Sequence, residues 1–297
     1  MLKEKGRPAS ADGDAGRTAG HGRTLWLDCQ AGVAGDMLVA ALIDAAEDSE
    51  AAERAVRTTL AALPVEGFSL EVGRVSKAGI SCLDFNVVLD EAHENHDHDM
   101  AYLHGHEHAC EGDHSHIHGQ EGGCGHDHCG GHHHGDHHHH AGHAGHAHDH
   151  AHAHAGDGGR HHAHRNLADI LAIIEAAPLA PGAAAFARRT FGVLAEAEAE
   201  AHGLPVEQVH FHEVGAVDSI ADIVAAAVLV DLIGIERAIV PVLVEGRGTV
   251  RCQHGVIPVP VPATANIAQA HGLILRLTDN DGEMVTPTGA AIAAAVR

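Results

Sequence analysis

Aromatic and basic residues are both scarce in this chain of 297 residues. Phe, Trp and Tyr together make up 2% of the sequence, so any hydrophobic core must be built mainly from Ala, Val, Leu and Ile. Only 18 Lys and Arg stand against 41 Asp and Glu, and the formal net charge of −23 argues against sequence-independent binding to DNA or RNA. An acidic chain is better suited to binding cations.

Long apolar segments are also missing. The longest apolar stretch, residues 223–235, is too short to span a membrane and contains Asp231. Residues 1–23 hold charges, Gly and Ala without the apolar centre of a signal peptide, which predicts a disordered N-terminal tail and a cytoplasmic location. Without a secretory signal, the six Cys are expected to be reduced thiols and not a disulfide framework.

Histidine, in contrast, is abundant and concentrated in one place. Residues 93–164 contain 27 of the 33 His, within a low-complexity insertion that we place at residues 91–164. Neutral imidazoles bind nickel, copper, zinc and cobalt ions. Because no rigid scaffold fixes these donors, we expect the insertion to be disordered and to bind several ions with poor geometry, as a metal buffer outside any chemistry.

The rest of the sequence predicts an α/β (α+β) fold, a mixed sheet with flanking helices that the His-rich insertion interrupts. We expect an N-terminal α/β part over residues 24–90 and a second α/β part over residues 165–297. Strands are predicted at 24–29, 68–75, 81–89, 209–214, 237–244 and 249–252. Helices are predicted at 37–46, 50–63, 167–177, 181–201, 217–233, 262–270 and 288–296.

The strongest candidate site is a short segment that reads His-Phe-His-Glu and then enters a helix. In an extended chain His210 and His212 point to the same side, and Asp218 and Asp222 share one face of the following helix. With Glu213 added, two imidazoles and up to three carboxylates suit a first-row divalent ion. The alternative is a capped helix start that carries ordinary polar surface residues.

A second candidate is the turn that follows the first predicted strand. A strand, a Gly-containing turn and a helix start can form an anion cradle of backbone N–H groups. Cys29 would add a soft sulfur donor. The residues of this cradle are Asp28, Cys29, Gly32, Gly35 and Asp36. The alternative is a purely structural turn in which Asp36 caps the helix.

A third candidate lies in the Gly-Arg-Gly and Cys-Gln-His-Gly motifs. Arg247, between two glycines, predicts a fork for a phosphate or carboxylate. Cys252 and His254 are two apart on a predicted strand, so they would share a face and could hold a soft or borderline metal. The alternative is an edge segment with an incidental His.

A fourth candidate precedes the last predicted helix. Thr286 and Thr288 flank Pro287 at the start of that helix. We predict that Thr288 caps the helix, and both hydroxyls are candidates for a ligand contact.

Taken in order, five motifs resemble the nickel insertion proteins that mature the nickel-pincer nucleotide cofactor of lactate racemase. The motifs are LDC–GVAGDM within 27–37, RNLADI at 165–170, HFHEVGAVDSI at 210–220, CQHG at 252–255 and TPTGAA at 286–291. The resemblance covers residue 24 to the end, apart from the His-rich insertion. Gln30 and Ala31 depart from it, because the family has an aromatic residue and Ser there.

The resemblance implies an enzyme, a CTP-dependent nickel cyclometallase of the lyase class. Such an enzyme places nickel into pyridinium-3,5-bisthiocarboxylic acid mononucleotide, forming two Ni–S bonds and one Ni–C bond. It hydrolyses CTP to CMP and pyrophosphate with manganese or magnesium. The resemblance also implies a C-terminal CTP-binding domain or subunit beyond Arg297, reached by frameshifting or supplied by a separate gene, and lactate racemase as the recipient of the cofactor. We expect an oligomer.

Combined with the motifs, the resemblance predicts a role for each candidate residue. The predicted metal ligands are His210, His212, Asp222, Cys252 and His254. Glu213 and Asp218 are the candidate catalytic carboxylates, and one of them would take the proton lost from the pyridinium carbon. The predicted cofactor contacts are Asp28, Cys29, Gly32, Gly35, Asp36, Arg247, Thr286 and Thr288. Two other functions remain open: a nickel or zinc store or chaperone without catalysis, and a metallohydrolase.

Overall fold

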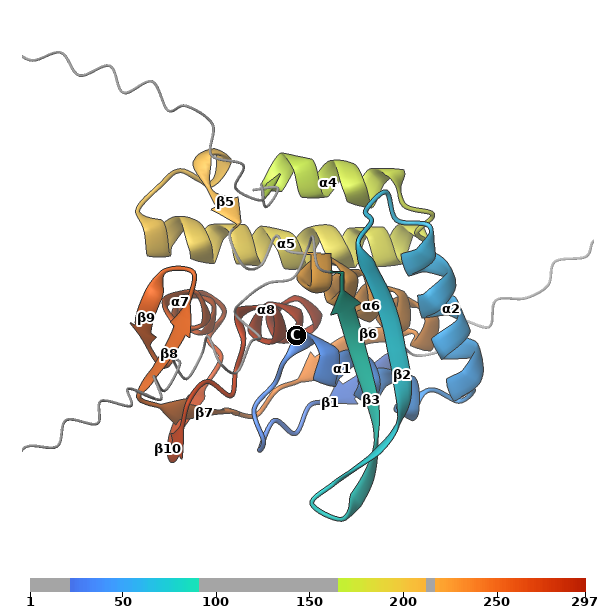
Figure 1. Cartoon of the computed structure of the whole chain (residues 1–297), viewed down its shortest axis with the longest axis horizontal. Coiled ribbons are helices and arrows are strands. Elements are labelled where there is room, and N and C mark those ends of the chain that lie inside the picture. Colours follow the sequence, from blue (N-terminus) through green and yellow to red (C-terminus); the bar gives the residue numbers. More distant parts are fainter. Residues whose placement is uncertain (1–21, 91–164, 212–216) are drawn as a thin grey trace, which may run out of the picture. The chain divides into compact units, whose positions relative to one another are not determined.

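The computed structural model describes residues 22–90, 165–211 and 217–297, which form a mixed α/β fold, as predicted (Figure 1). The helices of these ranges are α1 (Gly35–Ala45), α2 (Ser49–Ala61), α4 (Leu167–Ala176), α5 (Pro181–His202), α6 (Val217–Ile233), α7 (Pro262–His271) and α8 (Pro287–Val296), with the 3-10 turn η2 (Val206–Gln208). The strands are β1 (Arg23–Trp26), β2 (Phe68–Lys77), β3 (Ile80–Leu89), β4 (Arg165–Asn166), β5 (His210–Phe211), β6 (Ile235–Ile239), β7 (Leu243–Arg247), β8 (Thr249–Cys252), β9 (Gly255–Pro258) and β10 (Leu275–Asp281). The predicted tail at 1–23, apart from its last two residues, and the His-rich insertion lie outside the described residues.

Small two-stranded sheets replace the single mixed sheet that we predicted. β1 pairs with β6 and β7 with β10 in parallel, whereas β2–β3, β4–β5 and β8–β9 are antiparallel. An isolated bridge between Cys29 and Leu243 links the two parallel pairs. The strand predicted at 237–244 is interrupted before β7 by Pro241, which has no backbone N–H to give to a ladder.

Helix α6 lies at the centre of the hydrophobic core, packed against α1, α2 and α5. Ten of its 17 side chains are buried, so most of the surface of the helix contacts protein. Several of them are alanines, such as Ala225 and Ala226, whose small side chains let neighbouring helices come close. Four of the five Phe are also buried, so the core is mainly aliphatic with a few aromatic contributions.

Side-chain caps define the start of two helices. Asn166 accepts a hydrogen bond from the N–H of Asp169, and the Asp169 carboxylate accepts one from the N–H of Asn166, which confirms the predicted N-cap as a capping box. The prediction that Thr288 caps the last helix was wrong. Thr286 is the cap, because Pro287 takes the first helical position and places Thr288 inside the first turn, where it is buried.

The first strand carries an unusual exposed residue. Trp26, the single Trp of the chain, is 62% exposed, and its register partner on β6, Ile239, is 45% exposed.

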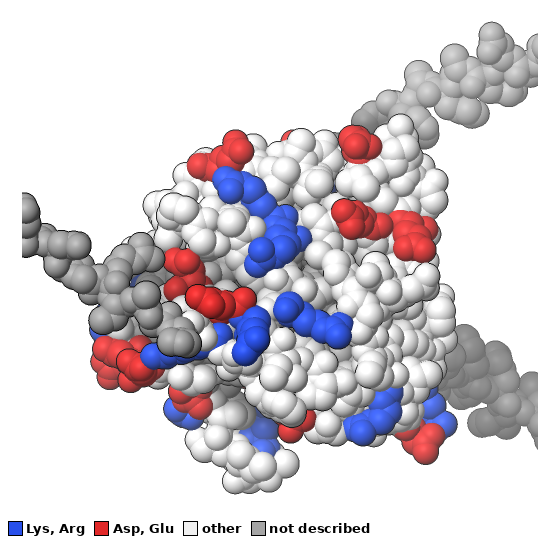
Figure 2. Space-filling model, turned by 180° about the vertical axis from the view of Figure 1, so that it is seen from behind, with Lys and Arg blue, Asp and Glu red and all other residues white. Residues whose placement is uncertain are grey.

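Figure 2 shows one face of the molecule, on which several Lys and Arg side chains lie beside Asp and Glu, so that charges of opposite sign offset each other. Within the described ranges, no helix combines the length and the apolarity that a membrane-spanning helix needs.

We predict that truncation of α6 destabilises the protein only on its buried faces. Leu229 has no exposed surface, so Leu229→Ala should lower the free energy of unfolding by about 2–5 kcal/mol. Leu232 on the same helix is 54% exposed, and Leu232→Ala should change the free energy by less than about 0.5 kcal/mol. Urea titration followed by circular dichroism measures both. Similar losses in the two variants would contradict a central position for α6.

Candidate functional site

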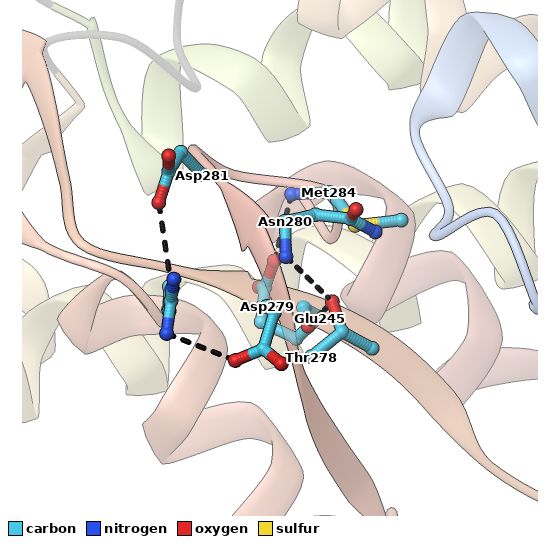
Figure 3. Close-up of polar contacts among 7 residues, drawn as sticks. Glu245, Thr278, Asp279, Asn280, Asp281 and Met284 are labelled. Carbon is cyan, nitrogen blue, oxygen red and sulfur yellow. Dashed lines mark hydrogen bonds and ion pairs between the residues drawn. The ribbon is translucent and has the colours of Figure 1, made fainter.

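A fully buried glutamate organises the region in which the candidate residues lie. Glu245 on β7 has no exposed surface. Its Oε1 atom accepts hydrogen bonds from the backbone N–H groups of Gly246 at 2.7 Å, Met284 at 2.7 Å and Val285 at 3.2 Å. Figure 3 shows Glu245 and Met284. The Glu245 Oε2 atom is also buried and has no hydrogen-bond partner among the described residues. This carboxylate therefore fixes the segment that leads into α8.

Sequence reasoning missed Glu245, although one signal was present. Side chains alternate along a strand, so Glu245 shares a face of β7 with Leu243, which is fully buried. A charged residue on the buried face of a strand must have internal partners.

The segment held by Glu245 in turn holds the turn between β1 and α1. The N–H of Val33 donates to the carbonyl of Met284 at 2.9 Å, and the N–H of Thr286 donates to the carbonyl of Val33 at 3.1 Å. Gly32 has φ +83°, and a Cβ there would lie 2.0 Å from the Met284 carbonyl oxygen. Only glycine fits this approach.

In the predicted anion cradle the backbone N–H groups of this turn would point at a ligand, whereas in the structure two of them donate to carbonyl groups of the protein. The N–H of Gly32 donates to the carbonyl of Cys29 at 3.2 Å, and the N–H of Val33 is taken by Met284. Helix α1 begins at Gly35 with Ala34 as its N-cap, so Asp36 lies in the first turn and does not cap the helix as we had considered. At this helix start the Asp36 carboxylate accepts a hydrogen bond from the N–H of Met37, and the Asp222 carboxylate accepts one from the N–H of Asp36.

Cys29 is buried beside the exposed Asp28. Burial raises the pKa of the Cys29 thiol, and the negative charge of Asp28 raises the pKa further. Both effects favour the neutral thiol over the thiolate, which is the form that binds metal. Cys29, the predicted soft sulfur donor, is therefore a weak metal ligand unless a cation displaces the proton of its thiol.

Three carboxylates gather where α1 meets α6. Asp36 and Asp218 are both close enough to raise the pKa of Asp222 by charge repulsion, and the N–H of Asp36 donates to the Asp222 carboxylate. Gly35 makes room for Asp222, because a Cβ at Gly35 would lie 2.5 Å from Asp222 Oδ2. We call Asp36, Asp218 and Asp222 the carboxylate trio. The prediction that Asp218 and Asp222 share a face of α6 is confirmed, and Asp36 of α1 lies close to Asp222 as well.

Within the trio, Asp222 has the most perturbed environment. Removal from water is the largest cause that raises its pKa well above the ordinary value, followed by repulsion from Asp36 and then Asp218, and the hydrogen bond from Asp36 opposes the shift. Its Oδ1 atom is buried without a hydrogen-bond partner among the described residues. The folded protein therefore binds the Asp222 proton more tightly than the unfolded chain does.

This shift predicts a pH dependence of stability. A carboxyl whose pKa is raised by folding favours the folded state at low pH, and this contribution is lost as the pH rises through the folded-state pKa. Asn at position 222 cannot ionise, so Asp222→Asn avoids the loss of stability that ionisation of Asp222 causes at high pH. In chelator-treated buffer the substitution should therefore raise the free energy of unfolding at pH 8 by about 1–2 kcal/mol. The gain should shrink toward pH 4.

Thermal unfolding at several pH values measures this effect, with Asp231→Asn as the matched control. Asp231 is exposed on the same helix, so its replacement should leave the pH profile unchanged. A constant difference between the Asp222→Asn variant and the parent protein from pH 4 to pH 8 would contradict the assignment.

Arg247 already pairs with two carboxylates at the end of β7, those of Asp279 and Asp281, which Figure 3 labels. Its Nη1 atom lies 2.9 Å from Asp279 Oδ1, and its Nε atom lies 3.5 Å from Asp281 Oδ1. The predicted fork for a phosphate is thus occupied by β10, a strand that we did not predict. All three side chains are exposed, and exposed ion pairs contribute only about 0–1 kcal/mol, so a ligand could compete for the guanidinium.

Cys252 and His254 are in contact, as predicted, but for a different reason. Cys252 ends β8, and His254 lies in the tight turn before β9, so a turn and not strand alternation brings them together. Cys252 Sγ lies 3.9 Å from His254 Nδ1. His202, at the end of α5, places its ring 5.0 Å from that of His254. Sequence reasoning missed His202, because nothing local links it to a turn so far along the chain.

The His-Phe-His-Glu segment is only partly described. His210 is exposed on β5 and pairs in register with Asn166 of β4, while Phe211 is buried in the core. The predicted ligand His212 and the predicted catalytic carboxylate Glu213 lie outside the described residues. Within the described part of the chain, no three His, Cys, Asp or Glu side chains are positioned together to hold a metal ion.

We predict that the acceptor role of Glu245 stabilises this region. Glu245→Ala leaves three backbone N–H groups without their acceptor and should cost about 3 kcal/mol or more. Glu245→Gln keeps an acceptor oxygen and should cost less than half as much. Urea unfolding measures both, and hydrogen exchange at Met284 and Val285 localises the change. Equal losses in the two variants would rule out the acceptor role.

Carboxylate, imidazole and thiol groups are the donors that proteins use for divalent metal ions. The sequence model of the family described as nickel insertion protein matches residues 25–297. A protein of Alkaliphilus metalliredigens (strain QYMF), named pyridinium-3,5-bisthiocarboxylic acid mononucleotide nickel insertion protein, is 41% identical over 274 residues, which are 92% of this chain and 52% of that protein. A protein of the same name from Geobacillus kaustophilus (strain HTA426) is 36% identical over 270 residues, 91% of this chain and 50% of that protein.

This chain belongs to the nickel insertion protein family. It spans about half the length of the curated relatives that it matches. No solved structure matches it.

Proposed function

We propose that this chain supplies the nickel-inserting portion of an enzyme that places nickel into pyridinium-3,5-bisthiocarboxylic acid mononucleotide and so forms the nickel-pincer nucleotide cofactor. The observation that carries the proposal is the family match over residues 25–297, together with relatives named for this reaction at 41% and 36% identity. Nickel is a substrate here, because it leaves within the product.

The proposal includes a second portion that binds CTP with manganese or magnesium. This chain covers 52% of the Alkaliphilus protein, so the remaining half is where we assign the CTP site, whether on the same polypeptide or as a separate subunit. CTP is hydrolysed to CMP and pyrophosphate in the reaction. The finished cofactor then passes to lactate racemase.

We place the nickel that reacts at the entrance of α6. His210 on β5, His212 and Glu213 precede the helix, and Asp222 follows one turn into it. The closeness of Asp222 to Asp218 and Asp36 supports a cation at this point, because a divalent ion would offset the repulsion that raises the Asp222 pKa.

A carboxylate must also take the proton that leaves the pyridinium carbon as the Ni–C bond forms. Asp218 is half-buried in the first turn of α6, and Asp218 or Glu213 fills this general-base role in the proposal. Arg247 and the hydroxyls of Thr286 and Thr288 are the proposed contacts to the substrate phosphate.

Replacement of the proposed ligands should abolish product formation. The assay mixes nickel, the pyridinium substrate, CTP, Mn²⁺ and the C-terminal portion of the Alkaliphilus relative with this chain, and detects the nickel product by mass spectrometry. His210→Ala with His212→Ala removes two proposed nickel ligands and should abolish product formation. Asp218→Asn with Glu213→Gln removes both candidate bases and should lower the rate at least about 100-fold. Asp231→Asn, on the same helix about 20 Å further along, should have no effect. Full activity in the double His variant would refute the site.

The His-rich insertion favours one second function, a metal store or chaperone without catalysis. Deletion of residues 91–164 separates the two functions. If the insertion only buffers nickel, the shortened protein binds fewer nickel ions but still yields product at saturating nickel. If storage is the whole function, neither the full chain nor the shortened chain yields product.

A further inference from the structure

The parallel strands of the fold lie side by side in one row. β1 pairs with β6, and further along the N–H of Val244 on β7 donates to the carbonyl of Cys29 at 3.2 Å. The N–H of Leu243, the residue before it, donates to the carbonyl of Ile274 at 2.8 Å. Successive N–H groups of a strand point to opposite sides, so the β6–β7 segment lies between β1 and β10.

One side of this row faces the hydrophobic core, and the other side is exposed. Leu27 and Ala238 belong to the core, and helices α6 and α8 contact β6. Trp26 and Ile239 alternate with these buried residues and stand outside the core, at 62% and 45% exposure. Because the two are register partners on neighbouring parallel strands, their side chains lie together on the same exposed side.

A third apolar side chain extends this exposed side toward β10. Ile274 is 63% exposed and directly follows the buried Leu273, and the alternation in exposure continues to Arg276. Ile274 therefore shares a side with Arg276, whose guanidinium reaches across the row to the side-chain oxygen of Gln30. We call Trp26, Ile239 and Ile274 the open sheet face.

Polar groups border the open sheet face at both ends. Before Trp26 and Ile239, Arg237 Nε donates to Thr24 Oγ1 at 3.0 Å, and after them Arg276 donates to Gln30. An apolar centre with a polar border is the usual anatomy of a protein–protein interface, where Trp and Arg are also enriched.

Two physical arguments indicate that another surface covers this face. Parallel strands occur almost only in sheets that are covered on both faces. The chain also has a single Trp among few aromatic residues, and this large apolar side chain is mostly in water. Burial of the indole against a partner would remove that apolar surface from water.

The position of the last residue indicates which partner this is. Arg297 Nη1 donates to the carbonyls of His271 at 2.8 Å and Gly272 at 2.7 Å, just before Ile274. A polypeptide that continues from Arg297 would therefore start at the border of the open sheet face. The Alkaliphilus relative has about as much chain again as the 52% that is matched here.

We propose that the open sheet face binds the second portion of the nickel insertion protein, the half of the relatives that this chain does not match. The partner surface must offer an apolar pocket to the Trp26 indole and hydrogen-bond acceptors to Arg237 and Arg276. The identity of the partner rests on the proposed function, whereas the contact itself requires no reaction.

Isothermal titration calorimetry of the full chain with the C-terminal portion of the Alkaliphilus protein tests the contact, without nickel, CTP or the pyridinium substrate. Trp26→Thr and Ile239→Thr keep a β-branched residue in β1 and β6. Ile80→Thr on β3 is the matched control, because Ile80 is 71% exposed elsewhere on the chain. Trp26→Thr should raise the Kd at least about tenfold, Ile239→Thr at least about threefold and Ile80→Thr less than about twofold. Circular dichroism and urea unfolding confirm that each variant folds.

The other possible occupants of the face give different results. Absence of binding by the parent chain, or a Kd that Trp26→Thr leaves unchanged, would overturn the proposal. Self-association of the parent chain that Trp26→Thr abolishes in sedimentation velocity would also overturn it, because the face would then bind a second copy. Binding that appears only after removal of residues 1–21 would assign the face to that segment instead.

A rate measurement separates docking from catalysis. In the product assay described above, Trp26→Thr should lower the rate when the C-terminal portion is limiting, and an excess of that portion should restore it. A loss that excess does not restore would overturn the docking role. The calorimetric test contains no reactants, so its failure is distinct from failure of the proposed function.

Discussion

The Glu245 carboxylate lies where β7, the segment before α8 and the β1–α1 turn converge. It gives Gly246, Met284 and Val285 a common acceptor, and the segment that it fixes bonds to Val33 in turn. A fully buried carboxyl group is tolerated only with such partners. The start of α1, and with it the place where Asp36 meets Asp222, depends on this one group.

The described part of the chain holds two kinds of donor at two places. Oxygen donors gather at the start of α1 and α6, and imidazole and thiol donors gather at the end of α5. Hard ions such as magnesium and manganese prefer oxygen donors, whereas borderline ions such as nickel prefer imidazole and thiolate, so the two places differ in the ions that their donors suit.

Local pattern was enough to predict much of this fold. The continuous apolar run at 217–233 predicted α6 with its observed bounds, and Asn166 marked the start of α4. Strand β10 was missed because its Thr-Asp-Asn-Asp end is polar and its pairing with β7 is non-local. His202 was missed for a similar reason, since its neighbour His254 comes from a hairpin far along the chain. The local motif could not predict the backbone hydrogen bonds that join Val33 to the distant residues Met284 and Thr286, one of which uses the N–H of Val33.

The poverty in aromatic residues has a practical consequence at Trp26. Trp26 is the one source of intrinsic indole fluorescence in this protein. Its side chain on β1 is 62% exposed, so most of the indole contacts water even in the native state. The emission will therefore shift little when the core melts. It will shift to shorter wavelength when another surface covers the β1–β6 edge, so the native chain carries a site-specific optical reporter for docking at that edge.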